Sequence, residues 1–171
     1  MASYCFFGRG AALPYDAYGV NVLKRKVDLP SLIATDYGKL ALAASPTTAL
    51  TSFTQFSASD VLELWEVPAG TLLLNMGVRV STAEGATCTA DIGNASATQT
   101  HLLTIDADGY MGTINLNSAT NQIALVSDAQ LGCDNNMGVL FVTAGSIDLT
   151  FGHDTDAAIF DVWALVAGPV F

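Results

Sequence analysis

The stretch Thr71-Leu72-Leu73-Leu74-Asn75-Met76-Gly77-Val78-Arg79-Val80 decides the fold class, because apolar side chains recur in it at every second position. One parity holds Leu72, Leu74, Met76, Val78 and Val80, and the other holds Thr71, Leu73, Asn75, Gly77 and Arg79. Such alternation is typical of a β-strand that turns one face to a core and the other to solvent. We therefore predict a half-buried strand here, with the Leu72 parity facing inward.

Further short strands flank this one on both sides. The adjacent apolar pair Leu64-Trp65 shifts the parity of the run over 62–67 and predicts a β-bulge. Downstream, we predict strands over 87–92, 122–126, 139–142, 146–151 and 157–166, and a polar loop over 93–112. Strands spaced by about 8 to 15 residues, without a helical period between them, indicate an antiparallel β-sandwich or jelly roll. The predicted fold class is mainly β.

The final run, 157–166, is apolar at nearly every position. A strand that is apolar on both faces belongs in the middle of a sandwich, or in a sheet whose outer face is covered by another subunit.

The first 58 residues differ in composition from the remainder. They hold three of the five prolines and four of the five tyrosines, with weak periodicity and a short helix expected within 31–42. We predict two parts, an extended N-terminal arm or irregular outer layer over 1–58 and a β-sandwich domain over 59–171.

Charge is scarce and unevenly placed. Charged residues make up 13% of the chain and hydrophobic residues 51%, against a usual charged share of about 25%. So little polar material predicts that partners cover part of the surface. The first 39 residues carry five basic and three acidic side chains, a net charge of +2. The remainder therefore carries −12, which gives the chain its net −10. That remainder cannot neutralise phosphates, which excludes nucleic acid as a partner.

The basic residues Arg9, Lys24, Arg25 and Lys26 form the candidate partner-binding set. Two interpretations of the Lys24-Arg25-Lys26 triplet stay open at this point: a solvated charge run beside a strand, and an electrostatic dock for an acidic neighbouring protein.

Targeting and redox signals are weak. Met1 to Gly10 lacks the pattern of a secretory signal, and no apolar run approaches the length of a membrane span, so we predict no membrane partner. The three cysteines, Cys5, Cys88 and Cys133, are odd in number and far apart, which fits assembly in a reducing cytoplasm.

Motifs that carry chemistry are missing or isolated. His101 and His153 share no motif with the carboxylates, and His153-Asp154-Thr155-Asp156 is better interpreted as a hairpin turn than as a metal site. Asp106-Ala107-Asp108-Gly109 lacks the spacing of a calcium loop. Trp65, Trp163 and Tyr110 offer a sugar-stacking platform, but core packing is the favoured role for both tryptophans. We predict no enzyme, no cofactor and no metal.

Several segments carry a resemblance to a known class of proteins. They are Asp60 to Thr71, Gly77-Val78, Thr82 to Thr87, Thr89 to Gly93, Asn115 to Asn117, Phe141 to Ala144, Ser146 to Thr150 and Val162 to Val166. Together they resemble small virion structural proteins of tailed bacteriophages, particularly those of aquatic and cyanobacterial hosts. The resemblance covers about 60–171 and includes no catalytic residue. Similar proteins often have Asp where this chain has Asn94.

This resemblance implies a capsid decoration or cement protein that binds and stabilises the head shell, with the major capsid protein as partner. It also implies a homo-oligomer, specifically a trimer, located in the virion and assembled in the host cytoplasm. A tail, neck or fibre component and a host-surface carbohydrate-binding module remain the alternatives.

Overall fold

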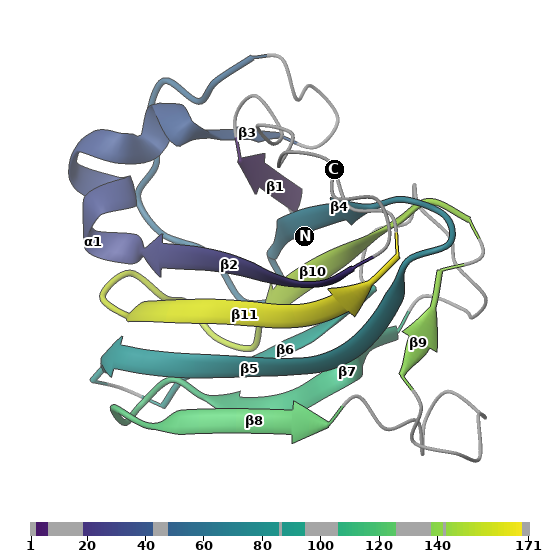
Figure 1. Ribbon diagram of the computed structural model, residues 1–171. Helices are drawn as coiled ribbons and strands as arrows, with labels where there is room; N and C mark the ends of the chain where they lie inside the picture. The colour runs from purple at the N-terminus through teal and green to yellow at the C-terminus, as the bar shows by residue number, and fades with distance from the viewer. Residues whose placement is uncertain are drawn as a thin grey trace.

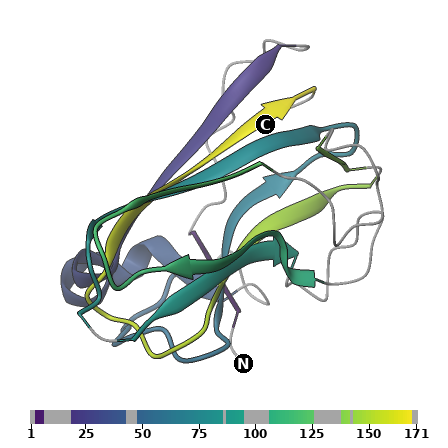
Figure 2. The same cartoon turned by 90° about the horizontal axis from the view of Figure 1, so that it is seen from below.

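Two β-sheets pack face to face in the computed structural model, which describes residues 3–6, 19–42, 48–85, 87–94, 106–125, 138–141 and 143–168 (Figures 1 and 2). The six-stranded sheet has the order β3 (Leu40–Leu42), β1 (Ser3–Phe6), β4 (Val61–Val67), β10 (Gly145–Phe151), β6 (Thr89–Asn94), β7 (Asp106–Asn115). The five-stranded sheet has the order β2 (Val20–Asp28), β11 (Ile159–Ala167), β5 (Leu72–Thr82), β8 (Asn121–Leu125), with β9 (Val139–Leu140) also paired to β5. The predicted antiparallel β-sandwich is confirmed.

The strand pairs are nested along the chain. β2 pairs with β11, β4 with β10, β5 with β8 and β6 with β7, all antiparallel. Strands that are outermost in the sequence therefore pair with each other, and the innermost pair with each other. One long hairpin folded over into two facing sheets has this order of pairing. β1, β3 and β9 add to this framework, and β1 runs parallel to β4.

The core fills the space between the two inner sheet faces. Leu62, Ile147 and Leu149 enter it from the six-stranded sheet, and Phe160 and Val162 from the five-stranded sheet, all essentially inaccessible to solvent. At one end Phe151 stacks on Phe56 with ring centroids 4.4 Å apart, and Phe53 meets Phe56 edge-on at 4.7 Å. Aromatic pairs of this kind add to the stability gained from burial alone.

Short helical turns link β2 to β3. They run through α1 (Leu29–Ser31), η1 (Leu32–Asp36) and η2 (Tyr37–Lys39). Asp28 starts them, because its Oδ1 accepts a hydrogen bond from the backbone N–H of Ser31 at 3.2 Å, an N-cap contact. A helical segment was predicted within 31–42, but residues 40–42 form strand β3. No helix in the described ranges has the length and apolar character needed to cross a membrane.

The described part of residues 1–58 differs from the predicted arm. Strand β2 pairs with β11 along its whole length, and Leu23 and Val27 from β2 lie in the core together with Leu29 and Phe56. The charged triplet interrupts the apolar alternation of this strand, which is why its periodicity looked weak. Residues 7–18 and 43–47, which the arm would include, lie outside the described residues.

Two further predictions differ from the structure in detail. The predicted loop over 93–112 contains most of strand β7, while its central residues lie outside the described ranges. In β5 the ladder to β11 shifts register between Leu165 and Val166, and Leu74 is the extra residue. Leu73, Met76, Val78 and Val80 therefore point inward, and Leu72 and Leu74 belong to the opposite face, where they are only partly buried.

Candidate assembly surface

The outer face of the five-stranded sheet carries the features that a binding surface needs. In its central strand β11, Phe160, Val162, Ala164 and Val166 point into the core and are fully buried. The alternating residues Ile159, Asp161, Trp163, Leu165 and Ala167 form the outer face and are all partly exposed. This strand is the predicted run with two apolar sides. No described element lies over its outer side in Figures 1 and 2.

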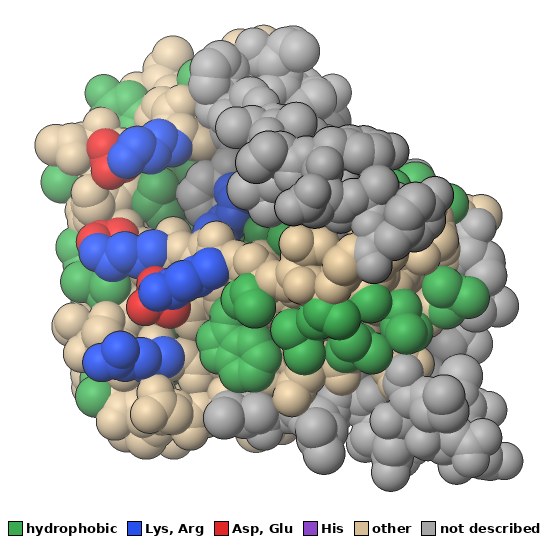
Figure 3. Space-filling view, in the orientation of Figure 1, with side chains coloured by type: hydrophobic (Ala, Val, Ile, Leu, Met, Phe, Trp, Pro, Cys, Tyr) green, Lys and Arg blue, Asp and Glu red, His purple; other side chains and the backbone are tan. Residues whose placement is uncertain are grey.

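One end of this face is charged. Lys24 Nζ lies 3.5 Å from an Asp161 carboxylate oxygen, and Lys26 Nζ lies 2.7 Å from Asp28 Oδ2. Arg79 stands opposite Asp161 on the neighbouring strand β5. The hydrogen bond with Asp28 raises the pKa of Lys26 and lowers the pKa of Asp28. We call these five residues the charged end; the basic side chains are visible at the left of Figure 3.

The basic triplet is divided by the strand that carries it. Lys24 and Lys26 point to the outer face, whereas Arg25, between them, points to the other side of β2 and is partly buried. Burial lowers the pKa of the Arg25 guanidinium, and the nearby carboxylate of Glu63 opposes that effect. Arg25 therefore belongs to a different environment from its two neighbours, and Arg9 lies outside the described residues. Strand geometry brings only Lys24 and Lys26 of the predicted set together on this face.

The other end of the face is apolar. Val20 and Val22 are 63% and 62% exposed, and Leu140 is 44% exposed. Register places Val20 opposite Ala167, Ala167 opposite Leu72, and Leu72 opposite Leu140, so an aliphatic row crosses four strands. Val22 adds a second row with Leu165. We call these six residues the apolar end; it forms the hydrophobic stripe toward the right of Figure 3.

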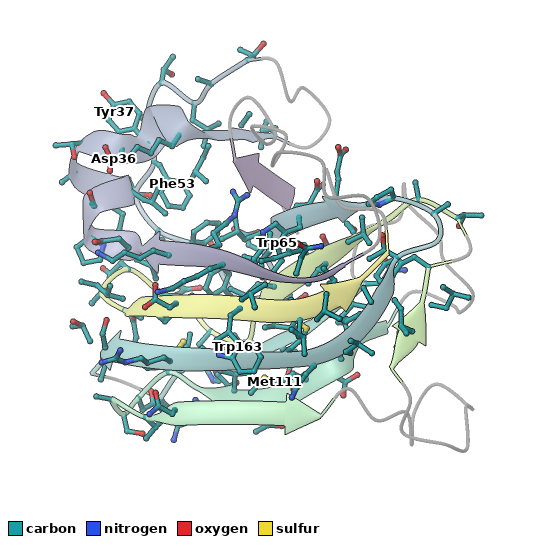
Figure 4. All side chains as sticks on the ribbon, viewed as in Figure 1. Asp36, Tyr37, Phe53, Trp65, Met111 and Trp163 are labelled. Atoms are coloured by element: carbon teal, nitrogen blue, oxygen red, sulfur yellow. The ribbon has the colours of Figure 1, made fainter. Side chains whose placement is uncertain are left out.

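Trp163 divides the two ends. Its indole lies over Gly77 of β5, and any side chain at position 77 would collide with the ring (Figure 4). Trp163 is opposite Lys24 on one side and Gly77 on the other, so its ring covers the centre of the sheet while staying partly exposed. The glycine in this strand thus allows the close approach of an aromatic ring.

A glycine also sets the position of Leu140. Gly138 has φ +88°, and a Cβ there would collide with the backbone carbonyl of Leu73. With that turn in place, Val139 enters the core and Leu140 faces outward beside Leu72. The exposed leucine is therefore fixed by backbone geometry.

The candidate chemical sites of the sequence are not assembled in the described ranges. Trp65 packs in the core as predicted, together with Tyr110, but Trp163 lies partly exposed on the outer face, so its predicted core packing is wrong and the three rings form no platform. Asp106 and Asp108 lie in strand β7, and His101 lies outside the described residues. In the described ranges, no group of three or more histidine, cysteine or acidic side chains could hold a metal ion.

The apolar end was not predicted from the sequence, for two reasons. Val20 and Val22 were assigned to an arm, and Leu72 was assigned to the inward parity of its strand. The signal that could have found it is the apolar outer side of 157–166, since a central strand of that kind requires apolar neighbours on the same face.

Comparisons with known proteins identify the fold. No family model matches this sequence, and no curated protein matches it either. A chain in the structure "Capsid of Ralstonia phage GP4" matches with a TM-score of 0.55 and 11% identity, over 95% of this chain and 93% of that one. A chain of the "Cyanophage Pam1 capsid asymmetric unit" matches with a TM-score of 0.53 and 13% identity, over 95% and 94%. Such low identities show a shared fold. At this coverage the likeness includes most of residues 1–58 as well as the later strands.

Proposed function

We propose that this chain is a virion structural protein of a tailed phage, specifically a decoration protein that binds the head shell and stabilises it. Its partners would be the major capsid protein and further copies of itself in a trimer assembled in the host cytoplasm. The fold is shared, over nearly the whole chain, with chains whose structures are described as phage capsids. The outer face of the five-stranded sheet supplies the contact surfaces.

The observation that carries the proposal is the row of exposed apolar side chains on the outer face of the five-stranded sheet. A free monomer would expose the row from Val20 to Leu140 to water, at a cost that grows with the apolar area left uncovered. A protein that functions within an assembly avoids this free-energy cost, because neighbouring subunits cover the apolar surface.

The charged end suits the contact with the shell. Lys24 and Lys26 are well exposed, and each is held near a carboxylate that restricts its movement. An acidic patch on the shell would exchange those local ion pairs for intermolecular ones. Charge pairs at the rim of an interface contribute mainly to the rate and specificity of association. Arg9 remains part of the predicted set, and Arg25 would act from the other side of β2.

The test uses purified shells that lack this protein and two matched charge reversals. Lys26 and Lys39 each lie 2.7 Å from a local aspartate, and their side chains are 59% and 63% exposed. We expect Lys26→Glu to weaken binding to shells by about tenfold or more, and Lys39→Glu to change it by less than about twofold. Co-sedimentation over a range of protein concentrations gives both affinities.

The outcomes separate the candidates for function. Stoichiometric addition of the wild-type chain to shells supports decoration, and equal loss in both lysine variants would remove the charged end from the contact. A chain that ignores shells but binds purified tails would be a tail, neck or fibre component instead.

A further inference from the structure

We infer that the apolar end of the outer face, Val20, Val22, Leu72, Leu140, Leu165 and Ala167, is the surface through which copies of this chain contact one another. The inference rests on the proposed function only in treating the chain as an oligomer. It names the surface that holds the oligomer together and separates it from the surface that meets the shell.

The first argument is charge. The chain carries a net −10, so two copies repel each other wherever acidic surfaces approach. The six residues of the apolar end are uncharged. On the same face, the carboxylates of Asp28 and Asp161 lie at the charged end, each beside a lysine. Among the described side chains of this face, copies that meet through the apolar end therefore bring only uncharged ones together.

The second argument is the breadth of the apolar rows. The first row extends from the edge strand β2 across the central strand β11 to β5 and β9, and the second joins Val22 to Leu165 and ends at Asn75 of β5. A single exposed valine is normal on a protein surface, but a contiguous row across four strands marks an interaction site. Two neighbouring rows also offer the flat, uncharged centre that oligomer interfaces have.

The third argument concerns the edge of β2, which offers another way for two copies to meet. An antiparallel pairing of two β2 strands about Lys24 would place Lys24 of one copy opposite Lys24 of the other. Lysines on an edge strand protect against this kind of pairing. Association through the face, not the edge, is therefore the favoured contact between copies.

Distance along the strand lets both surfaces work together. Val20 and Lys26 are six residues apart in β2, which corresponds to roughly 20 Å of extended chain. Copies that converge through their apolar ends around a symmetry axis would leave their charged ends away from that axis. The charged ends would then remain available to the shell.

The test is the double substitution Val20→Glu with Val22→Glu, in the full chain. Both side chains are more than half exposed, so we expect the fold to remain intact, with an unchanged thermal midpoint measured by circular dichroism. We expect the wild-type chain to be an oligomer by light scattering and analytical ultracentrifugation. The variant should associate at least about a hundredfold more weakly.

The matched control is Thr82→Glu with Ala119→Glu. These exposed residues add the same charge at the opposite end of the molecule, where β5 ends and β7 joins β8. The control should keep the mass of the wild-type oligomer. A variant at Val20 and Val22 that stays oligomeric, or a wild-type chain that stays monomeric, would overturn the inference.

The shell assay distinguishes this inference from the proposed function. A wild-type monomer that still adds to shells would contradict self-association through the apolar end and support the decoration proposal. An oligomer that is lost in the Val20/Val22 variant but never adds to shells would support self-association and contradict decoration. Trp163 gives an independent readout, because its emission should shift to the blue on association, with Trp65→Phe removing the signal of the buried tryptophan.

Discussion

The charged end and the apolar end share one sheet face, yet they solve the problem of exposure in different ways. At the charged end, Lys24, Lys26 and Arg79 lie near carboxylates, and charged side chains are well hydrated without a partner. At the apolar end, Val20 and Leu140 are exposed with no charge in the rows that they form. We therefore expect the charged end to bind reversibly and the apolar end to stay covered by a partner.

The largest effect on the molecule itself should come from the boundary between the ends. Gly77→Val would force a side chain into the space that the Trp163 indole occupies. We expect a loss of about 2 kcal/mol or more in the free energy of unfolding, measured by urea denaturation, because the ring must leave its place. Loss of the ring would also expose apolar strand surface between the two ends.

A double-mutant cycle makes this prediction specific. In a Trp163→Ala background, the added valine has room, and it is a better strand residue than glycine. We therefore expect Gly77→Val to be neutral or stabilising there. An equal cost in both backgrounds would mean that the indole is not what excludes a side chain at position 77.

A smaller effect should separate the two ends by their response to salt. Raising sodium chloride from about 50 to about 500 mM shortens the distance over which exposed charges interact to a few ångströms. Shell binding through Lys24 and Lys26 should weaken by about tenfold, while self-association should change by less than about twofold. Sedimentation at both salt concentrations measures the two processes on the same samples. Self-association that falls in parallel with shell binding would contradict the division of the face.

The sequence predicted the sheet class well and the placement of the surface poorly, for physical reasons. The alternation in 146–151 and the apolar run 157–166 both predicted strands, and these segments contain most of strands β10 and β11. Alternation did not report burial in β10, where Ser146 and Asp148 are buried as well. Alternation cannot report which strands pair, because the nested pairing of β2 with β11 joins residues at opposite ends of the chain. The first 58 residues resembled an arm because Lys24-Arg25-Lys26 interrupts the apolar alternation of β2, so neither the strand nor its partner was evident.

The candidate site shows the same limit at the level of single residues. Three consecutive basic residues suggested one patch, but a strand sends neighbours to opposite faces, and Arg25 points away from Lys24 and Lys26. The bulge at Leu74 likewise reversed the face of Leu72, because three consecutive leucines at 72–74 do not show where the parity changes. The adjacent pair Leu64-Trp65 in the neighbouring run did predict its bulge, and Leu64 is the extra residue there. By contrast, the doubly apolar character of 157–166 predicted either a central strand or a covered outer face, and the structure places it inside its sheet with partly exposed outer residues.

The smallest effect concerns the ion pair between Lys26 and Asp28 at the charged end. The hydrogen bond from Lys26 holds the pKa of Asp28 below its ordinary value of 3.8. A depressed carboxylate pKa contributes stability that is present above the unfolded value and is lost as the pH falls through the folded value, so the contact should be lost only below pH 3.8, the ordinary value. Because both groups are exposed, solvent screens this contribution.

Carboxyl NMR titration should show the Asp28 pKa rising toward 3.8 in Lys26→Gln, with the apolar end unaffected. Asp36, which is held in the same way by Lys39, is the internal control and should keep its lowered pKa. An unchanged Asp28 pKa in the variant would mean that the backbone N–H of Ser31, and not Lys26, sets the charge state at this end.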